Sequence, residues 1–310
     1  MLTFDKLKLV TSLHNISITD ESRFKKVLRN DALSYLIYTA ETLASLTIKI
    51  DFDRQEAVVE FTGKILGAHY PQLISYQNIR ECFDKINLMG CCRIDAEAMM
   101  DSKVVKCDAT KDVRYRDIPY LTSYIRNNVK NHQQYICRIP KNGNLIVEKN
   151  VMTRQCRKRL TIYDKGKEMS KADNLQFTNA YEIDSQTFDG ICRFELNLNS
   201  VTQIENSLQI LQTTLHDVLH AECNTIQDFV NQILADGVDY PITDKKSYHI
   251  LLTLKDCDYD IEKVELKMRQ FHPSRGVNIG KMMAPYREML ILLQNNKGRD
   301  YKGELLDLLA

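Results

Sequence analysis

Apolar and polar residues alternate with a period of two along several segments of the chain, which is the pattern of half-buried strands. The clearest segments are 46–52, 57–61, 91–98, 159–165 and 192–199. A polar stretch separates the first two, so we predict a hairpin over 46–61. The polar face of these strands carries Glu60, Asp95, Glu97, Tyr163, Lys165, Arg193 and Glu195. One buried and one solvated face is typical of an antiparallel sheet.

Other segments predict the elements between and around these strands. Helices are expected around 23–28, over 75–88, where apolar residues recur at helical spacing, and over 118–131, with Pro119 at its start. Further strands are expected at 7–10, 135–139 and 145–147, the last two joined by a turn at Asn142-Gly143. Residues 169–190 are polar and predict a surface loop.

The character of the chain changes after about residue 203, where the alternation stops and helical patterns begin. The predicted helices are interrupted at Pro241, at 273–276 and at 295–298. We therefore expect an α+β fold. Residues 1–203 would form an antiparallel-sheet domain with helices on one face, and residues 204–310 a helical domain.

Composition restricts the function classes. The chain of 310 residues has a net charge of +1, so nucleic-acid binding would need local basic patches, and the composition alone argues slightly against a DNA-binding protein. Its nine cysteines are scattered without a Cys-x-x-Cys pair, and no signal peptide or membrane-spanning apolar run is apparent. These features predict a cytoplasmic protein with reduced cysteines and no membrane partner.

The stretch 159–168 holds the candidate nucleophile. Thr161, Tyr163 and Lys165 fall on one strand face, and a basic run ending in Arg157, Lys158 and Arg159 comes just before or at its start. A tyrosine hydroxyl beside fixed cations suits attack on a phosphodiester, whose oxygens gather negative charge during the reaction. Such a run is usually a solvated edge, but beside a nucleophile it is expected to contact DNA phosphates.

Thirty residues after the tyrosine comes a second motif, Arg193-Phe194-Glu195-Leu196. The pair resembles the replication initiators of rolling-circle plasmids of the Rep-trans class and the related gene II replication proteins of filamentous phages. Those proteins also carry an upstream Arg-x-Asp strand and an earlier hairpin that ends in Glu-Phe. Here Arg93-Ile94-Asp95 and Glu60-Phe61 match these motifs in the same order. The resemblance covers roughly residues 46–200.

The resemblance implies an enzyme that nicks one strand of origin DNA. Tyr163 would keep the 5′ phosphate as a phosphotyrosine and leave a 3′ hydroxyl for a polymerase, with Lys165 beside it. Arg193 and Glu195 would orient the site or the DNA, and Glu168 would support it. A host helicase and a second copy of the chain stay open as further partners.

A divalent metal, Mg²⁺ or Mn²⁺, is also implied, with Asp95 and Glu60 among its ligands. Glu97 is added because it shares a strand face with Asp95. Hard carboxylate oxygens suit these ions, which would act as a Lewis acid on the scissile phosphate. The chain has no His-x-His strand of the kind that many nicking enzymes use, and the Rep-trans class also lacks one.

Alternatives remain at each level. Tyr163 could be an ordinary strand tyrosine, and Asp95 with Glu97 a solvated pair. His216 and His220 lie one helical turn apart, but without a third ligand they predict a helical surface or core pair. A transposase or mobilisation relaxase would use the same chemistry. A non-enzymatic initiator or repressor would instead bind duplex DNA through the helical carboxy-terminal part.

Overall fold

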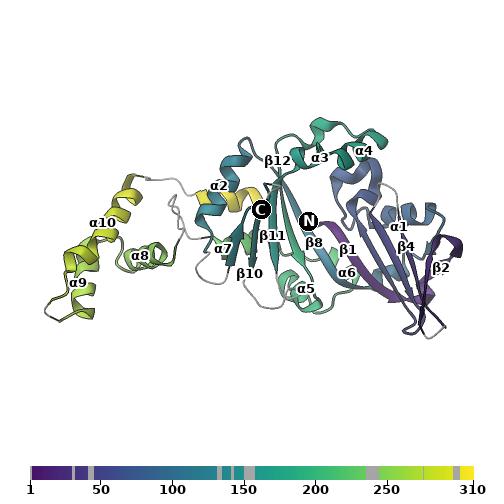
Figure 1. The fold of residues 1–310 in the computed structure, drawn as a ribbon, viewed down its shortest axis with the longest axis horizontal. Helices are drawn as coiled ribbons and strands as arrows, with labels where there is room; N and C mark the ends of the chain where they lie inside the picture. The colour runs from purple at the N-terminus through teal and green to yellow at the C-terminus, as the bar shows by residue number, and fades with distance from the viewer. Residues whose placement is uncertain are drawn as a thin grey trace.

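The computed structural model describes residues 2–29, 32–40, 45–130, 135–140, 143–149, 158–234, 244–274, 276–295 and 301–310. Its main feature is a ten-stranded antiparallel sheet in the order β3-β4-β5-β6-β1-β8-β12-β11-β10-β9 (Figure 1). These strands are β1 Thr3–Ser12, β3 Lys25–Arg29, β4 Ala32–Thr39, β5 Leu46–Asp51, β6 Glu56–Thr62, β8 Lys103–Arg114, β9 Tyr135–Arg138, β10 Leu145–Lys149, β11 Arg159–Asp164 and β12 Ile191–Leu198. A separate two-stranded sheet pairs β2 Ile16–Ile18 with β7 Cys92–Ile94.

Helices follow the strands and increase towards the carboxy-terminal part. The α-helices are α1 Ile79–Leu88, α2 Ile118–Asn128, α3 Lys165–Met169, α4 Ala172–Ala180, α5 Val201–Leu208, α6 Leu215–Leu219, α7 Thr225–Ile233, α8 Lys245–Asp256, α9 Ile261–Phe271, α10 Ile279–Asn295 and α11 Tyr301–Leu309. The 3-10 helices include η2 Glu21–Arg23, η3 Gly63–Gln72, η4 Ala98–Asp101 and η6 Ser185–Phe188. Several helices begin where a polar side chain accepts a backbone N–H, as Asp117 does from Tyr120 and Ser200 from Gln203.

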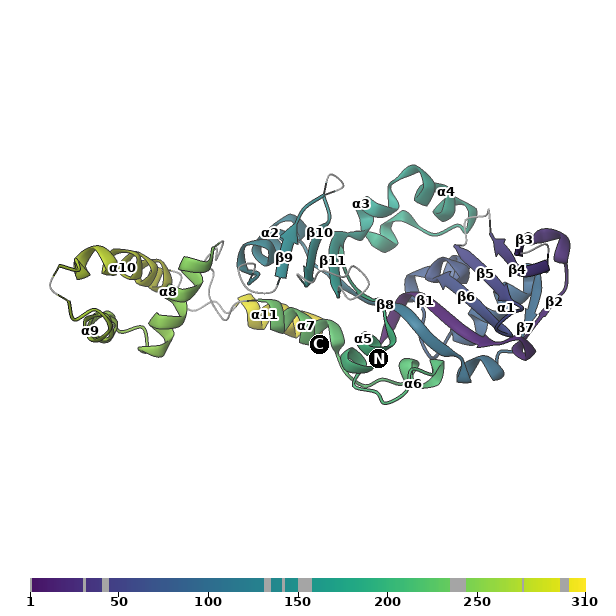
Figure 2. The ribbon, with the colours of Figure 1, turned by 60° about the horizontal axis from the view of Figure 1, so that its bottom comes forward.

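The central strands have one apolar face and one polar face. Leu7, Leu9, Ala109, Leu196 and Ile162 lie on the apolar face and are completely buried. Contacts with β8 and β12 place α5 and α7 over this face, and α6 and α11 also pack against β8. Figure 2 shows these helices on one side of the sheet and α3 and α4 on the other. Burial of such side chains stabilises a fold by roughly 1.5–3 kcal/mol each.

The α+β class and the antiparallel sheet are confirmed, as are the hairpin of β5 and β6 and the helices α1 and α2. The paired strands β9 and β10 are also as predicted, although Asn142 of their turn lies outside the described residues. The predicted strand at 7–10 is part of the longer β1.

Three predictions of local structure are wrong. The segment 23–28 forms the end of η2 and most of β3 rather than a helix, because its backbone pairs with β4. The strand at 91–98 ends at Ile94, since the Asp95 carboxylate accepts the backbone N–H groups of Glu97 and Ala98 and starts η4. The expected loop at 169–190 contains α4 and η6, which bury Phe177 and Phe188.

The helices do not pack as the predicted domain boundary at residue 203 requires. The buried cluster that contains the sheet includes residues of α5, α6 and α7, and Leu305 and Leu309 of α11. A second cluster is formed by α8, α9 and α10, which stand apart from the sheet in Figure 1. The reason is that α5 follows β12 directly and turns Ile204 and Leu208 into the core of the sheet. Among the described helices, none is long and apolar enough to cross a membrane.

Candidate functional site

Cross-strand pairing assembles a compact grid of side chains on the polar face of β8, β12 and β11. Three rows run across these strands: Asp112, Arg193 and Tyr163; Thr110, Glu195 and Thr161; Asp108, Asn197 and Arg159. The alternation of each strand sends every member of the grid to the same face. The sheet register therefore brings the tyrosine motif and the Arg-x-Glu motif together.

Tyr163 is held at the centre of the candidate site by a hydrogen bond. Its hydroxyl donates to Oε2 of Glu195 at 3.0 Å, and the residue is 9% exposed. Burial, followed by the nearby Glu195 carboxylate, raises the pKa of Tyr163 well above its ordinary value, so the phenol is neutral. Tyr163 also lines a pocket of about 220 Å³ together with Lys167, Glu168 and Lys171.

Glu195 has an acidity suited to proton transfer. Burial, with the added charges of Asp5 and Asp108, raises its pKa from 4.5 to about 7. The hydrogen bond from Tyr163 and the charge of Arg193 act in the opposite direction. Its carboxyl group can therefore hold or release a proton near neutral pH, as a general base must.

Arg193 organises the acidic groups around it. The side chain is fully buried, and its guanidinium donates two hydrogen bonds to Asp112, at 2.7 and 2.8 Å. It also donates to Asp5 at 2.8 Å and to the hydroxyl of Tyr70 at 3.2 Å. Asp5 lies at a register shift in β1 between Phe4 and Lys6. These charge-assisted bonds give Arg193 an orienting position rather than an exposed one for DNA contact.

Lys165 is buried beside the tyrosine, and only 3% of the residue is exposed. Its ammonium donates to the Tyr70 hydroxyl at 2.6 Å and lies 5.8 Å from the centre of the Tyr163 ring. Burial, followed by the charge of Arg193, lowers the pKa of Lys165 to about 8. The lysine is thus a cation near neutral pH that loses its proton more easily than a surface lysine.

Sequence reasoning missed Tyr70, Asp5, Asp108 and Asp112. Tyr70 comes from the irregular segment η3, and Asp5 from the register shift in β1, so neither belongs to an alternating pattern. Asp108 and Asp112 lie on β8 at positions separated by even numbers of residues, with Thr110 between them. This alternation of polar residues could have been used to predict β8.

The three predicted metal ligands are not brought together. Glu60 forms ion pairs with Lys6 and, at 2.9 Å, with Lys8, and its strand is four positions from β11, or roughly 19 Å at usual strand spacing. Asp95 accepts backbone N–H groups at the start of η4, and Glu97 pairs with Arg80 at 2.7 Å on the surface. Within the described part of the chain, no three acidic, histidine or cysteine side chains are arranged to hold a metal ion.

The predicted DNA-binding cations occupy different places. Arg159 lies on the face of Tyr163 and donates to Asn197 at 2.8 Å. Lys158 points to the opposite face, where its ammonium lies 4.8 Å from the centre of the Phe229 ring and burial lowers its pKa to about 8. Arg157 lies outside the described residues. Glu168 forms an ion pair with Lys171 and lines the tyrosine pocket.

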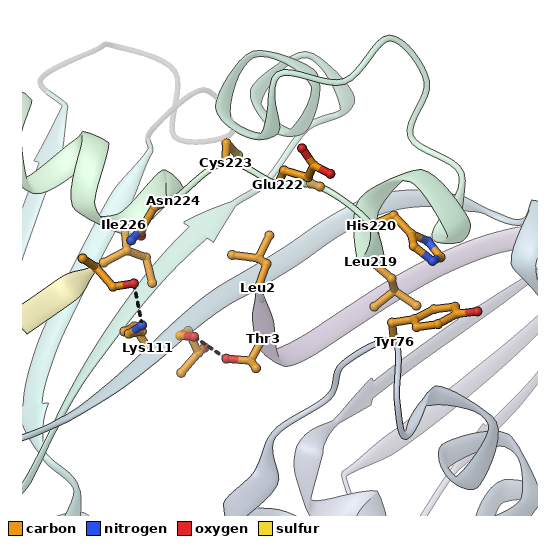
Figure 3. Close-up of a pocket in the computed structure, with 13 residues that line it drawn as sticks. Leu2, Thr3, Tyr76, Lys111, Leu219, His220, Glu222, Cys223, Asn224 and Ile226 are labelled. Atoms are coloured by element: carbon orange, nitrogen blue, oxygen red, sulfur yellow. Dashed lines mark hydrogen bonds between the residues drawn. The ribbon is translucent and has the colours of Figure 1, made fainter.

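Another pocket, of about 390 Å³, does not include Tyr163. Figure 3 shows the segment from Leu219 to Asn224 running past the start of β1, with Lys111 reaching into the same region. The rings of His216 and His220 stack at 4.1 Å, and Tyr76 contacts His220 at 4.0 Å. This arrangement is an aromatic stack rather than part of the tyrosine site.

The fold and the grid define an antiparallel-sheet protein. A tyrosine, a carboxyl group and an arginine lie side by side on the polar face of its sheet. No family model matches the chain, and no curated protein matches it. The interpretation of the site therefore depends on the side chains themselves.

Proposed function

We propose that this protein is a rolling-circle replication initiator that nicks one strand of origin DNA with Tyr163 as the nucleophile. The observation that carries the proposal is the 3.0 Å hydrogen bond from the Tyr163 hydroxyl to Glu195, with Arg193 and Lys165 beside it. A nucleophile within hydrogen-bond reach of a base, itself held by further groups, is the usual arrangement for covalent catalysis.

The reaction would begin with attack of the Tyr163 oxygen on the scissile phosphorus. Because the pKa of Tyr163 is raised, its proton has to leave during the attack, and the Glu195 carboxylate is placed to accept it. The new oxygen–phosphorus bond yields a 5′-phosphotyrosine. The bond from phosphorus to the 3′ oxygen breaks, and that oxygen takes a proton from water to become a 3′ hydroxyl. The Lys165 ammonium supplies positive charge next to the reacting phosphate.

A metal requirement remains part of the proposal, with a revised choice of ligand. Among the described residues, no donor reaches Oδ1 of Asp108, although this oxygen is buried. Burial raises the pKa of Asp108, and the neighbouring Asp5 carboxylate adds to that effect. An unsatisfied buried oxygen suits a cation, so Asp108 would contribute one ligand to Mg²⁺ or Mn²⁺, with water and the phosphate of bound DNA supplying the others. A bound ion would act as a Lewis acid on the phosphate.

The test is covalent trapping of single-stranded origin DNA. The wild-type protein should form a denaturation-resistant adduct with a labelled strand in the presence of Mg²⁺. The Tyr163→Phe variant should form none, yet retain DNA binding. Tyr135→Phe is a matched control, because Tyr135 is also a buried strand tyrosine, 6% exposed.

Undiminished adduct formation by Tyr163→Phe would show that Tyr163 is not the nucleophile. DNA binding by the wild-type protein without any adduct would favour a non-enzymatic initiator. Unchanged cleavage in excess EDTA would remove the metal from the mechanism.

A further inference from the structure

The polar face that carries Tyr163 continues without interruption into the other half of the sheet. Cross-strand partners connect the strands one by one in the order β11-β12-β8-β1-β6-β5. One row of partners runs through Arg159, Asn197, Asp108, Lys6 and Thr62, and the next runs through Lys106, Lys8, Glu60 and Thr47. The tyrosine site and these lysines therefore lie on the same face of the sheet, with the buried Asn197 and Asp108 between them.

This second half of the face exposes cations interleaved with apolar and aromatic groups. The side chains of Lys6, Lys8 and Lys49 are 26%, 36% and 38% exposed. The Lys49 ammonium lies 3.8 Å from the centre of the Tyr35 ring, so the aromatic group reaches the same surface. Half-buried apolar side chains fill the spaces between them: Val10, Ile37 and Val58. On the opposite face of the same strands the side chains are fully buried.

We propose that this surface, the lysine face, binds the single-stranded DNA that leads to Tyr163. The lysine face is defined by Lys6, Lys8, Lys49, Lys106 and Tyr35. The inference rests on the proposed function, because it takes the reacting strand as its occupant. Lysines match the charge of phosphates, while aromatic and apolar side chains offer stacking surfaces for unpaired bases. The bases of a duplex are stacked in its interior, so the aromatic and apolar side chains would have no unpaired bases to contact.

The dimensions fit a short single strand. Five strand spacings separate β5 from β11, which is roughly 24 Å. Site sizes of single-strand binding surfaces run from about 4 nucleotides upwards, so a few nucleotides would extend from Lys49 to the tyrosine. Glu60 pairs with both Lys6 and Lys8 and so holds the two ammonium groups at the surface. The shared sheet face with the tyrosine and the complementary charge together select this occupant.

The experiment measures DNA binding separately from cleavage. All variants carry Tyr163→Phe and are titrated, in EDTA and at several salt concentrations, with a labelled oligo-dT of about 12 nucleotides. The Lys8→Gln/Lys106→Gln double variant should lower the slope of log affinity against log salt by about 1.4. Affinity at 0.1 M salt should fall by about 25-fold, since each contact on a single strand contributes about 0.7 to the slope. Lys85→Gln, on the exposed side of α1, is the control and should change neither quantity.

Each outcome has a distinct meaning. An unchanged slope and affinity in a double variant with a normal melting temperature would refute the lysine face, whether or not the wild-type protein forms a tyrosine adduct. An equal loss of affinity for a duplex of the same length would overturn the choice of single-stranded DNA. If the wild-type protein forms no adduct but the lysine dependence is found, the lysine face stands and the nicking function falls.

Discussion

Glu195 lies where burial and two neighbouring carboxylates all favour its protonated form. Its pKa is raised from 4.5 to about 7 in the folded protein. The proton is therefore bound more tightly in the folded state than in the unfolded state. The stabilisation that this provides is complete below about pH 4 and is lost as pH rises through about 7.

At neutral pH the same group should therefore limit stability. We expect the urea midpoint of the metal-free protein to fall between pH 5 and pH 8, and Glu195→Gln to reduce that fall, because the amide does not titrate. Unfolding followed by circular dichroism at both pH values measures the effect. Glu205→Gln, which changes a carboxylate of α5 outside this cluster, is the control. An identical pH dependence in Glu195→Gln and wild type would show that Glu195 does not have the raised pKa.

The residues of the site differ in how far the sequence predicted them. Tyr163, Arg193 and Glu195 follow strand alternation, so their common face was predictable, and the register of β11 and β12 brings them together. Lys165 was expected on the same strand but is the first residue of α3. Their partners Asp5 and Tyr70 come from a register shift and a 3-10 segment, where position along the chain does not specify a direction.

At the scale of elements, β8 shows why a central strand is hard to recognise. It pairs with β1 on one side and β12 on the other, and its buried residues include Asp108 and Thr110 as well as apolar ones. Lys111 on the apolar side of the pattern, together with a register shift against β1, weakens the alternation of Asp108, Thr110 and Asp112. The hairpin β5–β6 has regular alternation and was predicted.

Helix α11 contributes to the core of the sheet although it follows the separate α8–α10 cluster. Leu305 is 2% exposed and packs within the main cluster, whereas Leu308 is 40% exposed. We expect Leu305→Ala to lower the unfolding free energy by about 2–5 kcal/mol, because it leaves a cavity. Leu308→Ala should change it by about 0.5 kcal/mol or less. Chemical denaturation measures both, and equal effects would mean that α11 does not dock on the sheet.

For the whole molecule, the boundary at residue 203 could not be refined from sequence. Both α5–α7 and α8–α10 are amphipathic, so the pattern alone does not reveal which helices pack on the sheet. The packing assigns α8–α10 to a core of their own. We therefore propose that this unit, rather than all of residues 204–310, carries duplex origin selectivity.

Replacement of residues 235–300 by a Gly-Ser linker tests this proposal. The shortened protein should keep its melting transition and its tyrosine adduct with single-stranded DNA, because the sheet, α5–α7 and α11 remain. Its preference for origin duplex over scrambled duplex should be lost, as competition binding would reveal. Retained preference would place duplex recognition on the sheet-containing part instead.

The ends of the segment that contains α8–α10 lie close together. The ammonium of Lys302, at the start of α11, donates to the carbonyl of Leu234, just after α7, at 3.4 Å. A segment whose two ends meet on one surface can be exchanged without opening the body that holds it. This segment is therefore joined to the sheet-containing part at two points that lie side by side. Another folded unit with adjacent termini could be grafted there without disturbing the sheet.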